Sequence, residues 1–360
     1  MTGRNSAPQE PRKPIPLQIV NTTRSTDALD EEPVFPEIEN GRRRRLDFLG
    51  YAPCPVRNEL RQRLHRRFLA LAAANGAPPV WFMPAGCHEP NPYDELWRTE
   101  DAAELPALIA ETGFGGFNQP SFVRRWLDSE TFAAVPDDAV RPEFADAGLL
   151  DSRRQHRVIA ANVEIVLADL NRLGARPLPR TWADILHARF QGDIIVSGGP
   201  GNIHESILFS LYRDHGEDGL SALGANVREF MHPAEMAKTA GSASPRGAAL
   251  YVLPWFFARA APHRPATRVV WPEEGAYLTP QYLLQRGGEN RGAALAAEYL
   301  CGSEWAEHLA RIGFAPARAG SPALPGRLRW VGWDFVRTQD LDALRGRLNA
   351  AFARGHRPGQ

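Results

Sequence analysis

The sequence predicts an α/β fold in two lobes, and three observations support this prediction. Of its 360 residues, 43% are hydrophobic and 23% are charged, as in a globular protein with a sizeable core. Short apolar runs alternate with segments whose apolar residues recur at helical spacing, which favours substantially parallel strands. The apolar run of residues 157–167 is too long for a typical strand, so we expect it to cross between two lobes.

Residues 1–45 are expected to form a disordered arm. They are rich in proline, then acidic, then basic, and they have almost no apolar periodicity. The run Arg42–Arg45 is interpreted as a solvated charge run; binding of an anionic partner is the alternative. A protein partner for this arm remains a hypothesis.

The first lobe is expected to comprise residues 46–160 and 270–360. Its elements follow one another as strand, loop and helix: a strand at 46–51, a helix at 56–74, a strand at 79–83, and helices that include 105–109 and 122–127. In such folds ligands lie at the carboxyl ends of the strands.

The second lobe is expected to comprise residues 161–269. The sequence predicts a helix over TWADILHARF, a strand over DIIVS, helices at 204–212 and around 219–223, a strand over NVREFM, a helix at 233–240 and a strand over AALYVL. The short strand RVVWP is expected to return the chain to the first lobe.

Charge and cysteine content exclude several classes of protein. Lys and Arg total 42 and so do Asp and Glu, so the chain lacks the basic field that nucleic-acid binding needs. The three cysteines are odd in number and widely spaced, which indicates no disulfide framework and a reducing compartment. No apolar span or secretory leader is visible, so we expect a cytoplasmic protein, or a periplasmic one if a leader is missing.

The glycine-rich segment Ser197–Asn202 follows a predicted buried strand and precedes a predicted helix. Backbone N–H groups and the positive end of a helix dipole meet at such a place, which suits an anion. A tight turn without a ligand is the alternative. The candidate ligand-binding residues here are Ser197, Gly198, Gly199, Asn202 and His204.

Other candidates follow other strands, where residues can line a cleft. The alternative interpretation of each is core packing or helix capping. These candidates are Tyr51, Cys54, Gly116, Asn118, His232, Tyr251 and Trp255.

A metal site of soft and borderline ligands is a second hypothesis. Its candidate ligands are Cys54, Cys87, His88, His204 and His232, although no paired spacing motif is present. Beyond this metal ion, the sequence identifies no cofactor.

The order of segments resembles the class II bacterial extracellular solute-binding proteins of ABC transporters, in particular the ferric-iron-binding branch. One recurring segment of that family is matched by Pro179, Thr181, Trp182, Asp184, Ile185, Leu186, Phe190, Gly192 and Ile194, and a second by Glu274, Gly275 and Ala276. Members of this family are normally exported, whereas no leader is visible here, so this chain is expected to be a leaderless offshoot. The tyrosine pair typical of ferric-iron binders is not recognisable either, which leaves the choice of ligand open.

The resemblance implies a type II periplasmic-binding-protein-like fold, with a hinge and an interlobe cleft. It implies a solute-binding protein that holds a small anion, or a metal bound with an anion, without catalysis. The alternative is an enzyme on the same scaffold that uses Cys54, or His204 and His232, for acid–base or metal-assisted chemistry.

Overall fold

A computed structural model describes residues 45–85, 91–133, 140–199 and 201–356. Residues 1–44 of the expected arm and the candidate metal ligands Cys87 and His88 lie outside the described residues. No helix in these ranges is long and apolar enough to cross a membrane.

The strands form one mixed sheet whose order along its main path is β2-β1-β3-β10-β4-β8-β5-β6. The strands are β1 (Phe48–Gly50), β2 (Trp81–Phe82), β3 (Leu108–Thr112), β4 (Arg157–Asp169), β5 (Ile194–Gly199), β6 (Asn202–Ile203), β7 (Val227–Met231), β8 (Leu250–Pro254), β9 (Thr267–Val270), β10 (Ala276–Gln285), β11 (Ala315–Pro316) and β12 (Leu328–Arg329).

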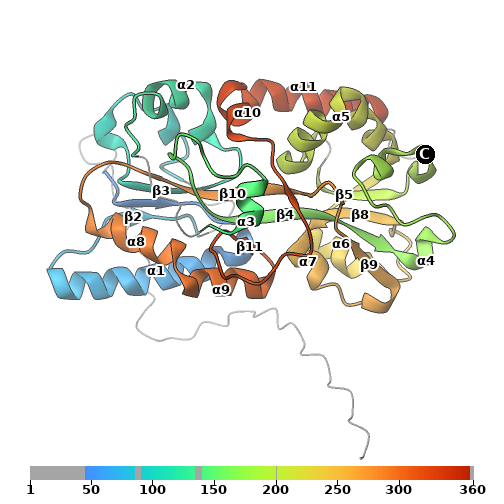
Figure 1. The fold of residues 1–360 in the computed structure, drawn as a ribbon, viewed down its shortest axis with the longest axis horizontal. Helices are drawn as coiled ribbons and strands as arrows, with labels where there is room; N and C mark the ends of the chain where they lie inside the picture. The colour runs from blue at the N-terminus through green and yellow to red at the C-terminus, as the bar shows by residue number, and fades with distance from the viewer. Residues whose placement is uncertain (1–44, 86–90, 134–139, 200, 357–360) are drawn as a thin grey trace, which may run out of the picture. The chain divides into compact units, whose positions relative to one another are not determined.

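Helices cover both faces of this sheet (Figure 1). They are α1 (Cys54–Asn75), α2 (Pro120–Phe122), α3 (Pro142–Asp146), α4 (Leu170–Leu173), α5 (Glu205–Asn226), α6 (Pro233–Thr239), α7 (Trp255–Arg259), α8 (Arg291–Cys301), α9 (Ser303–Ile312), α10 (Trp333–Thr338) and α11 (Leu341–Gly355). Single 3-10 turns include η3 (Gly116–Asn118), η5 (Ala183–Leu186) and η6 (Ala188–Phe190).

Two long strands, β4 and β10, join two groups of parallel strands. The second half of β10 pairs with β3, which continues into β1 and β2. The first half of β4 pairs with β10, and its second half pairs with β8, which continues into β5 and β7. We call β1–β3 the first strand group and β5, β7 and β8 the second. The expected crossing by residues 157–167 is therefore β4.

The return crossing differs from the prediction. The predicted strand RVVWP contains β9, which pairs with residues 166–169 of β4 on the side of the second strand group. The chain returns through β10, whose pattern is interrupted by Thr279, Pro280 and Gln281 and therefore does not read as a strand.

Two predicted helices are wrong. Residues 108 and 109, assigned to a helix, begin β3, because a short and fully buried apolar run has the same composition in either structure. TWADILHARF forms the 3-10 turns η5 and η6 instead of one helix. The two helices expected at 204–212 and 219–223 are merged in α5, with a kink at Gly216, where φ is 67°.

The two segments that carry the family resemblance contact each other at the start of β10. The backbone N–H of Trp182 donates to Glu274 Oε1 over 2.6 Å, and its indole N–H donates to the carbonyl of Gly275 over 2.9 Å. The fully buried Trp182 ring stacks on Tyr277 with 4.1 Å between centroids. These contacts fix β10 where it enters the sheet.

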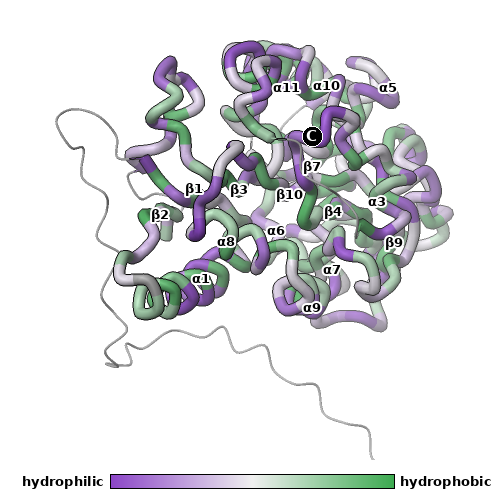
Figure 2. The backbone as a smooth tube through the Cα atoms, turned by 60° about the vertical axis from the view of Figure 1, so that its left-hand side comes forward, coloured by the Kyte–Doolittle hydropathy of each residue, from purple (hydrophilic) through white to green (hydrophobic). Residues whose placement is uncertain are grey.

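The core follows the strands. Figure 2 shows hydrophobic segments of β3, β4 and β10 inside the fold, and hydrophobic and hydrophilic residues alternating along α1. One cluster extends over both strand groups, and a second lies under α1, α8 and α9.

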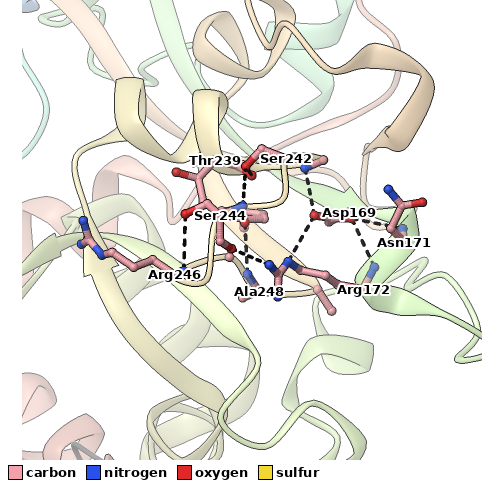
Figure 3. A network of polar contacts seen from close by, with 12 residues as sticks. Asp169, Asn171, Arg172, Thr239, Ser242, Ser244, Arg246 and Ala248 are labelled. Atoms are coloured by element: carbon pink, nitrogen blue, oxygen red, sulfur yellow. Dashed lines mark hydrogen bonds and ion pairs between the residues drawn. The ribbon is translucent and has the colours of Figure 1, made fainter.

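A polar network surrounds Asp169, the last residue of β4 (Figure 3). Asp169 caps α4 by accepting hydrogen bonds from the N–H groups of Asn171 and Arg172, and it also accepts from Gly241 over 2.8 Å. The Arg172 guanidinium donates to the carbonyl of Ser244. This network holds the C-terminal end of β4, which pairs with β8 and β9.

Candidate functional site

A row of polar side chains lies on one face of the two joining strands. In the antiparallel register, Thr279 of β10 is opposite Asn162 of β4, and Tyr277 is opposite Glu164. Gln281 is two residues beyond Thr279, and directly paired and alternate residues of a sheet share a face. We call Asn162, Glu164, Thr279 and Gln281 the polar row.

The polar row is buried, and most of it lacks internal partners. The exposed fractions are 0% for Glu164, 4% for Gln281, 7% for Thr279 and 9% for Asn162. Within the described residues, both carboxyl oxygens of Glu164, the hydroxyl of Thr279 and Nε2 of Gln281 have no hydrogen-bond partner. Each such group costs about 1–3 kcal/mol if it stays unpaired, so the row calls for partners beyond the described residues, such as water or a bound polar molecule.

Burial controls the charge of Glu164. It raises the pKa of this carboxyl to about 8. The nearest titratable neighbour is His204, whose Nδ1 lies 3.5 Å from Oε1 of Glu164 and 2.8 Å from Oγ of Ser206. Burial also lowers the pKa of His204, although 36% of its side chain is exposed. Burial thus favours the neutral form of both groups, with pKa values of about 8 for Glu164 and about 4 for His204.

A second buried carboxyl, Glu111, lies one residue before the end of β3. Burial raises its pKa to about 8, and the negative charges of Glu205 and Asp94 contribute in the same direction, against a hydrogen bond from the backbone N–H of Thr112. Glu205 is the first residue of α5, so its effect indicates that the end of β3 lies near the second strand group. Phe114, which follows β3, also contacts α5: its ring packs edge-on against the ring of Phe209, with 5.0 Å between the ring centroids.

The predicted glycine-rich segment forms a tight hairpin between β5 and β6. Gly198 pairs with Ile203 and Gly199 pairs with Asn202. Gly198 has φ of 123°, and a Cβ there would lie 2.4 Å from the carbonyl oxygen of Asn202, so the turn itself requires glycine. Ser197 is buried, and its hydroxyl has no partner among the described residues.

Three candidates of the first strand group hold the loops after β1 and β3. Asn118 Nδ2 donates to the Tyr282 hydroxyl over 2.6 Å, whereas its Oδ1 has no partner in the described ranges. A Cβ on Gly116 would lie 2.2 Å from the Trp97 ring. The Tyr51 hydroxyl accepts a hydrogen bond from Asn91 Nδ2 over 3.1 Å. Cys54 is exposed at the start of α1.

Three candidates of the second strand group have structural partners. His232 caps α6 by accepting a hydrogen bond from the N–H of Ala234. Tyr251 lies near the amino end of β8 and accepts from the N–H of Ala248, beside the network of Figure 3. The Trp255 ring packs edge-on against the Trp271 ring, with 5.3 Å between the ring centroids. These contacts put Tyr251 at the opposite end of β8 from Trp255.

The structure brings together His204 and Glu164, and it separates them from Tyr251. Among the described residues, no three His, Cys, Asp or Glu side chains could hold a metal ion; Cys87 and His88 are not among them. Sequence reasoning missed Glu111, Asn162, Glu164, Thr279 and Gln281. One signal was available, since Asn162 and Glu164 interrupt the apolar run of 158–167.

Comparisons with known proteins agree with this arrangement. Residues 103–339 match the model of a family described as bacterial extracellular solute-binding protein. A search of curated protein sequences finds no match.

Solved structures show the same fold. An apo ferric ion-binding protein A from Pasteurella haemolytica is 12% identical, with a TM-score of 0.56 over 86% of this chain and 96% of its own. An ABC transporter protein from Clostridium perfringens is 13% identical, with a TM-score of 0.58 over 87% and 100%. The periplasmic binding protein AfuA from Actinobacillus pleuropneumoniae, with fructose-6-phosphate bound, is 13% identical, with a TM-score of 0.56 over 86% and 98%.

Proposed function

This chain belongs to the bacterial extracellular solute-binding protein family, and we propose that it holds a small solute between two lobes by hinge closure, without catalysis. The observation that carries this proposal is the polar row, which lies on the two strands that join the strand groups. A solute there would contact the joining strands, and closure would remove it from water.

The lobes proposed are residues 46–160 with 270–360, and residues 161–269. They correspond to the first and second strand groups, with β4 and β10 between them. The C-terminal helix α11 is an exception within 270–360: it packs against α5, so we propose that it moves with the second lobe and not with the first.

We propose that the solute carries an anionic group, or is a metal bound with an anion. The support is the start of α5, a helix of 22 residues whose first N–H groups follow the hairpin of Ser197–Asn202. One structural relative holds fructose-6-phosphate, an anion, and another is a ferric ion-binding protein.

The alternative of an enzyme has less support. His232 is a helix cap, and Cys54 is exposed at the beginning of a helix. Only His204 of the proposed acid–base pair lies beside another titratable group of the polar row.

Location and protein partners are proposals from the sequence. The family description is of extracellular proteins, whereas the sequence predicts a cytoplasmic one. Fractionation of cells that express the full natural gene would decide this. A partner for residues 1–45 likewise remains a prediction.

X-ray scattering tests the proposed function. The full chain would be measured alone and with a panel of fructose-6-phosphate, inorganic phosphate, citrate and ferric citrate. We expect at least one of these to bind and to decrease the radius of gyration. A radius that stays constant while calorimetry reports binding would contradict hinge closure.

A further inference from the structure

Glu164 is an acceptor without a counter-charge. Its carboxyl group is fully buried, and neither oxygen has a hydrogen-bond partner in the described chain. The residues directly opposite it are Tyr277 of β10 and Pro254 of β8, and His204 approaches it from the start of α5. None of these carries a positive charge at pH 7.

Nearby arginines are committed elsewhere. The Arg329 guanidinium donates to both carboxylate oxygens of Asp214, and Arg345 is paired with Glu205 and Asp342. Among the described residues, no arginine or lysine is paired with Glu164, and its one ion-pair neighbour is His204, whose pKa burial lowers to about 4. Such a carboxyl is costly in its charged form unless a cation from outside joins it.

We propose that the solute carries a protonated amine and that Glu164 is its partner. This inference rests on the proposed function and names the chemistry of the solute at that site. An ammonium group supplies three N–H donors and a positive charge, and so matches both free oxygens of a carboxylate. A purely anionic solute would instead leave the carboxyl protonated and would gain no charge pairing from it.

The rest of the polar row suits the other end of such a molecule. The Thr279 hydroxyl and Nε2 of Gln281 are donors that are free within the described residues. Thr279 is two residues from Tyr277, the partner of Glu164, so it lies about 7 Å farther along the face. A small molecule with an amine at one end and an anionic acceptor at the other would span this distance.

Binding of an amine should release a proton. The pKa of Glu164 is about 8 in the empty chain, so this carboxyl is mostly protonated at pH 7, and pairing with an ammonium group requires its ionised form. The nearest other group that titrates is His204, already neutral at this pH. We expect about one proton released per solute at pH 7 and almost none at pH 9, where the carboxyl is already ionised and the amine of the solute is still protonated.

Calorimetry with matched pairs of probes tests the inference. One pair is 4-aminobutyrate and 4-hydroxybutyrate, and the other is phosphoethanolamine and 2-hydroxyethyl phosphate. Titration of the full chain in two buffers of different ionisation enthalpy counts the protons. We expect the amine of at least one pair to bind 10-fold or more tighter than its hydroxyl twin, with about one proton released.

Two variants locate the effect. Glu164→Gln keeps the shape and should abolish both the preference for the amine and the proton release, whereas the exposed control Glu289→Gln should change neither. If Glu164→Gln does not fold, Thr279→Val should weaken both twins equally and leave the proton count intact. Equal binding of the twins, an amine preference that survives Glu164→Gln, or no binding of either amine would overturn the inference. Closure on a member of the anion panel would still support the proposed function.

Discussion

At the scale of single residues, the charge of Glu164 couples stability to pH. The folded chain holds its proton up to a pKa of about 8, against a usual value of 4.5. Between these two values the folded state binds more protons than the unfolded state, so stability falls as pH rises through this window. The difference corresponds to a loss of several kcal/mol, at most about 5 kcal/mol.

Glu164→Gln should remove this dependence. We expect the variant to match the wild type at pH 5 and to melt at a higher temperature than the wild type at pH 8.5. Both melting temperatures are measured at the two pH values by thermal unfolding, with circular dichroism as the signal. The control Glu289→Gln, at an exposed position, should differ from the wild type in melting temperature by the same amount at both pH values. A variant that is no more stable at pH 8.5 would show that Glu164 has an internal partner.

A buried cluster around Asp151 gives a second prediction. Its carboxylate accepts hydrogen bonds from Arg337 and from the backbone and ring of His156; although burial acts in the opposite direction, these hydrogen bonds hold its pKa well below its usual range. Arg337→Met leaves this charge buried without its cation, so we expect a loss of about 3–5 kcal/mol in urea unfolding.

The control for this prediction is Arg347→Met. The Arg347 side chain is 54% exposed, so its loss should lower the free energy of unfolding by less than about 1 kcal/mol. The double variant Asp151→Asn/Arg337→Met should recover part of the loss. A loss no larger than that of Arg347→Met would contradict the structural role of the cluster.

The glycine-rich segment and His204 could be predicted because a strand, a turn and a helix start are visible in sequence. The polar row could not, since its members come from two strands more than a hundred residues apart and share a face only through their register. His232 and Tyr251 follow the same patterns as ligand residues, but their partners are a helix N–H and a turn N–H.

At the scale of elements, the contact between α5 and α11 depends on glycine. A Cβ on Gly224 of α5 would lie 2.2 Å from the carbonyl oxygen of Phe352 in α11. Gly224→Val should therefore push the helices apart and cost about 1–3 kcal/mol or more in urea unfolding.

The control lies in the same helix pair. A Cβ on Gly346 of α11 would meet nothing within 4 Å, so Gly346→Ala should be neutral or stabilise the chain by about 0.5–1 kcal/mol. Equal effects of the two substitutions would show that close approach of α5 and α11 is not needed.

Strands of the second group were predicted well, because each lies between clear helix signals and β5 and β8 are also apolar runs. β3 and β10 were not. β3 is too short and too evenly apolar for its period to distinguish strand from helix, and β10 carries Thr279, Pro280 and Gln281 at its centre. Thr279 and Gln281 break the apolar pattern by which a buried strand is recognised, and the same two polar side chains belong to the candidate site.

At the scale of the whole molecule, the proposed closing motion depends on the two joining strands. Along the main path of the described sheet, β10 pairs with the first strand group, β4 pairs with the second, and the two strands pair with each other; the polar row lies on them. Small changes along these strands would move the groups as bodies.

The arm gives a prediction at this scale. Residues 1–39 have too little apolar sequence to offset the entropy of ordering. Their deletion should leave the melting temperature within about 1–2 °C of the full chain, a shift well under 1 kcal/mol for a chain of this size. A decrease of many degrees would mean that the arm packs on the fold.

Native mass spectrometry tests the central claim most directly. The full chain and the variant Thr279→Val/Gln281→Leu would be incubated with the anion panel and the matched amine pairs. The account predicts that at least one solute adds its intact mass to the wild type in a 1:1 complex, and that this complex is lost in the folded variant. An unchanged complex in the variant, or the absence of any 1:1 complex in the wild type, would contradict solute binding at the polar row.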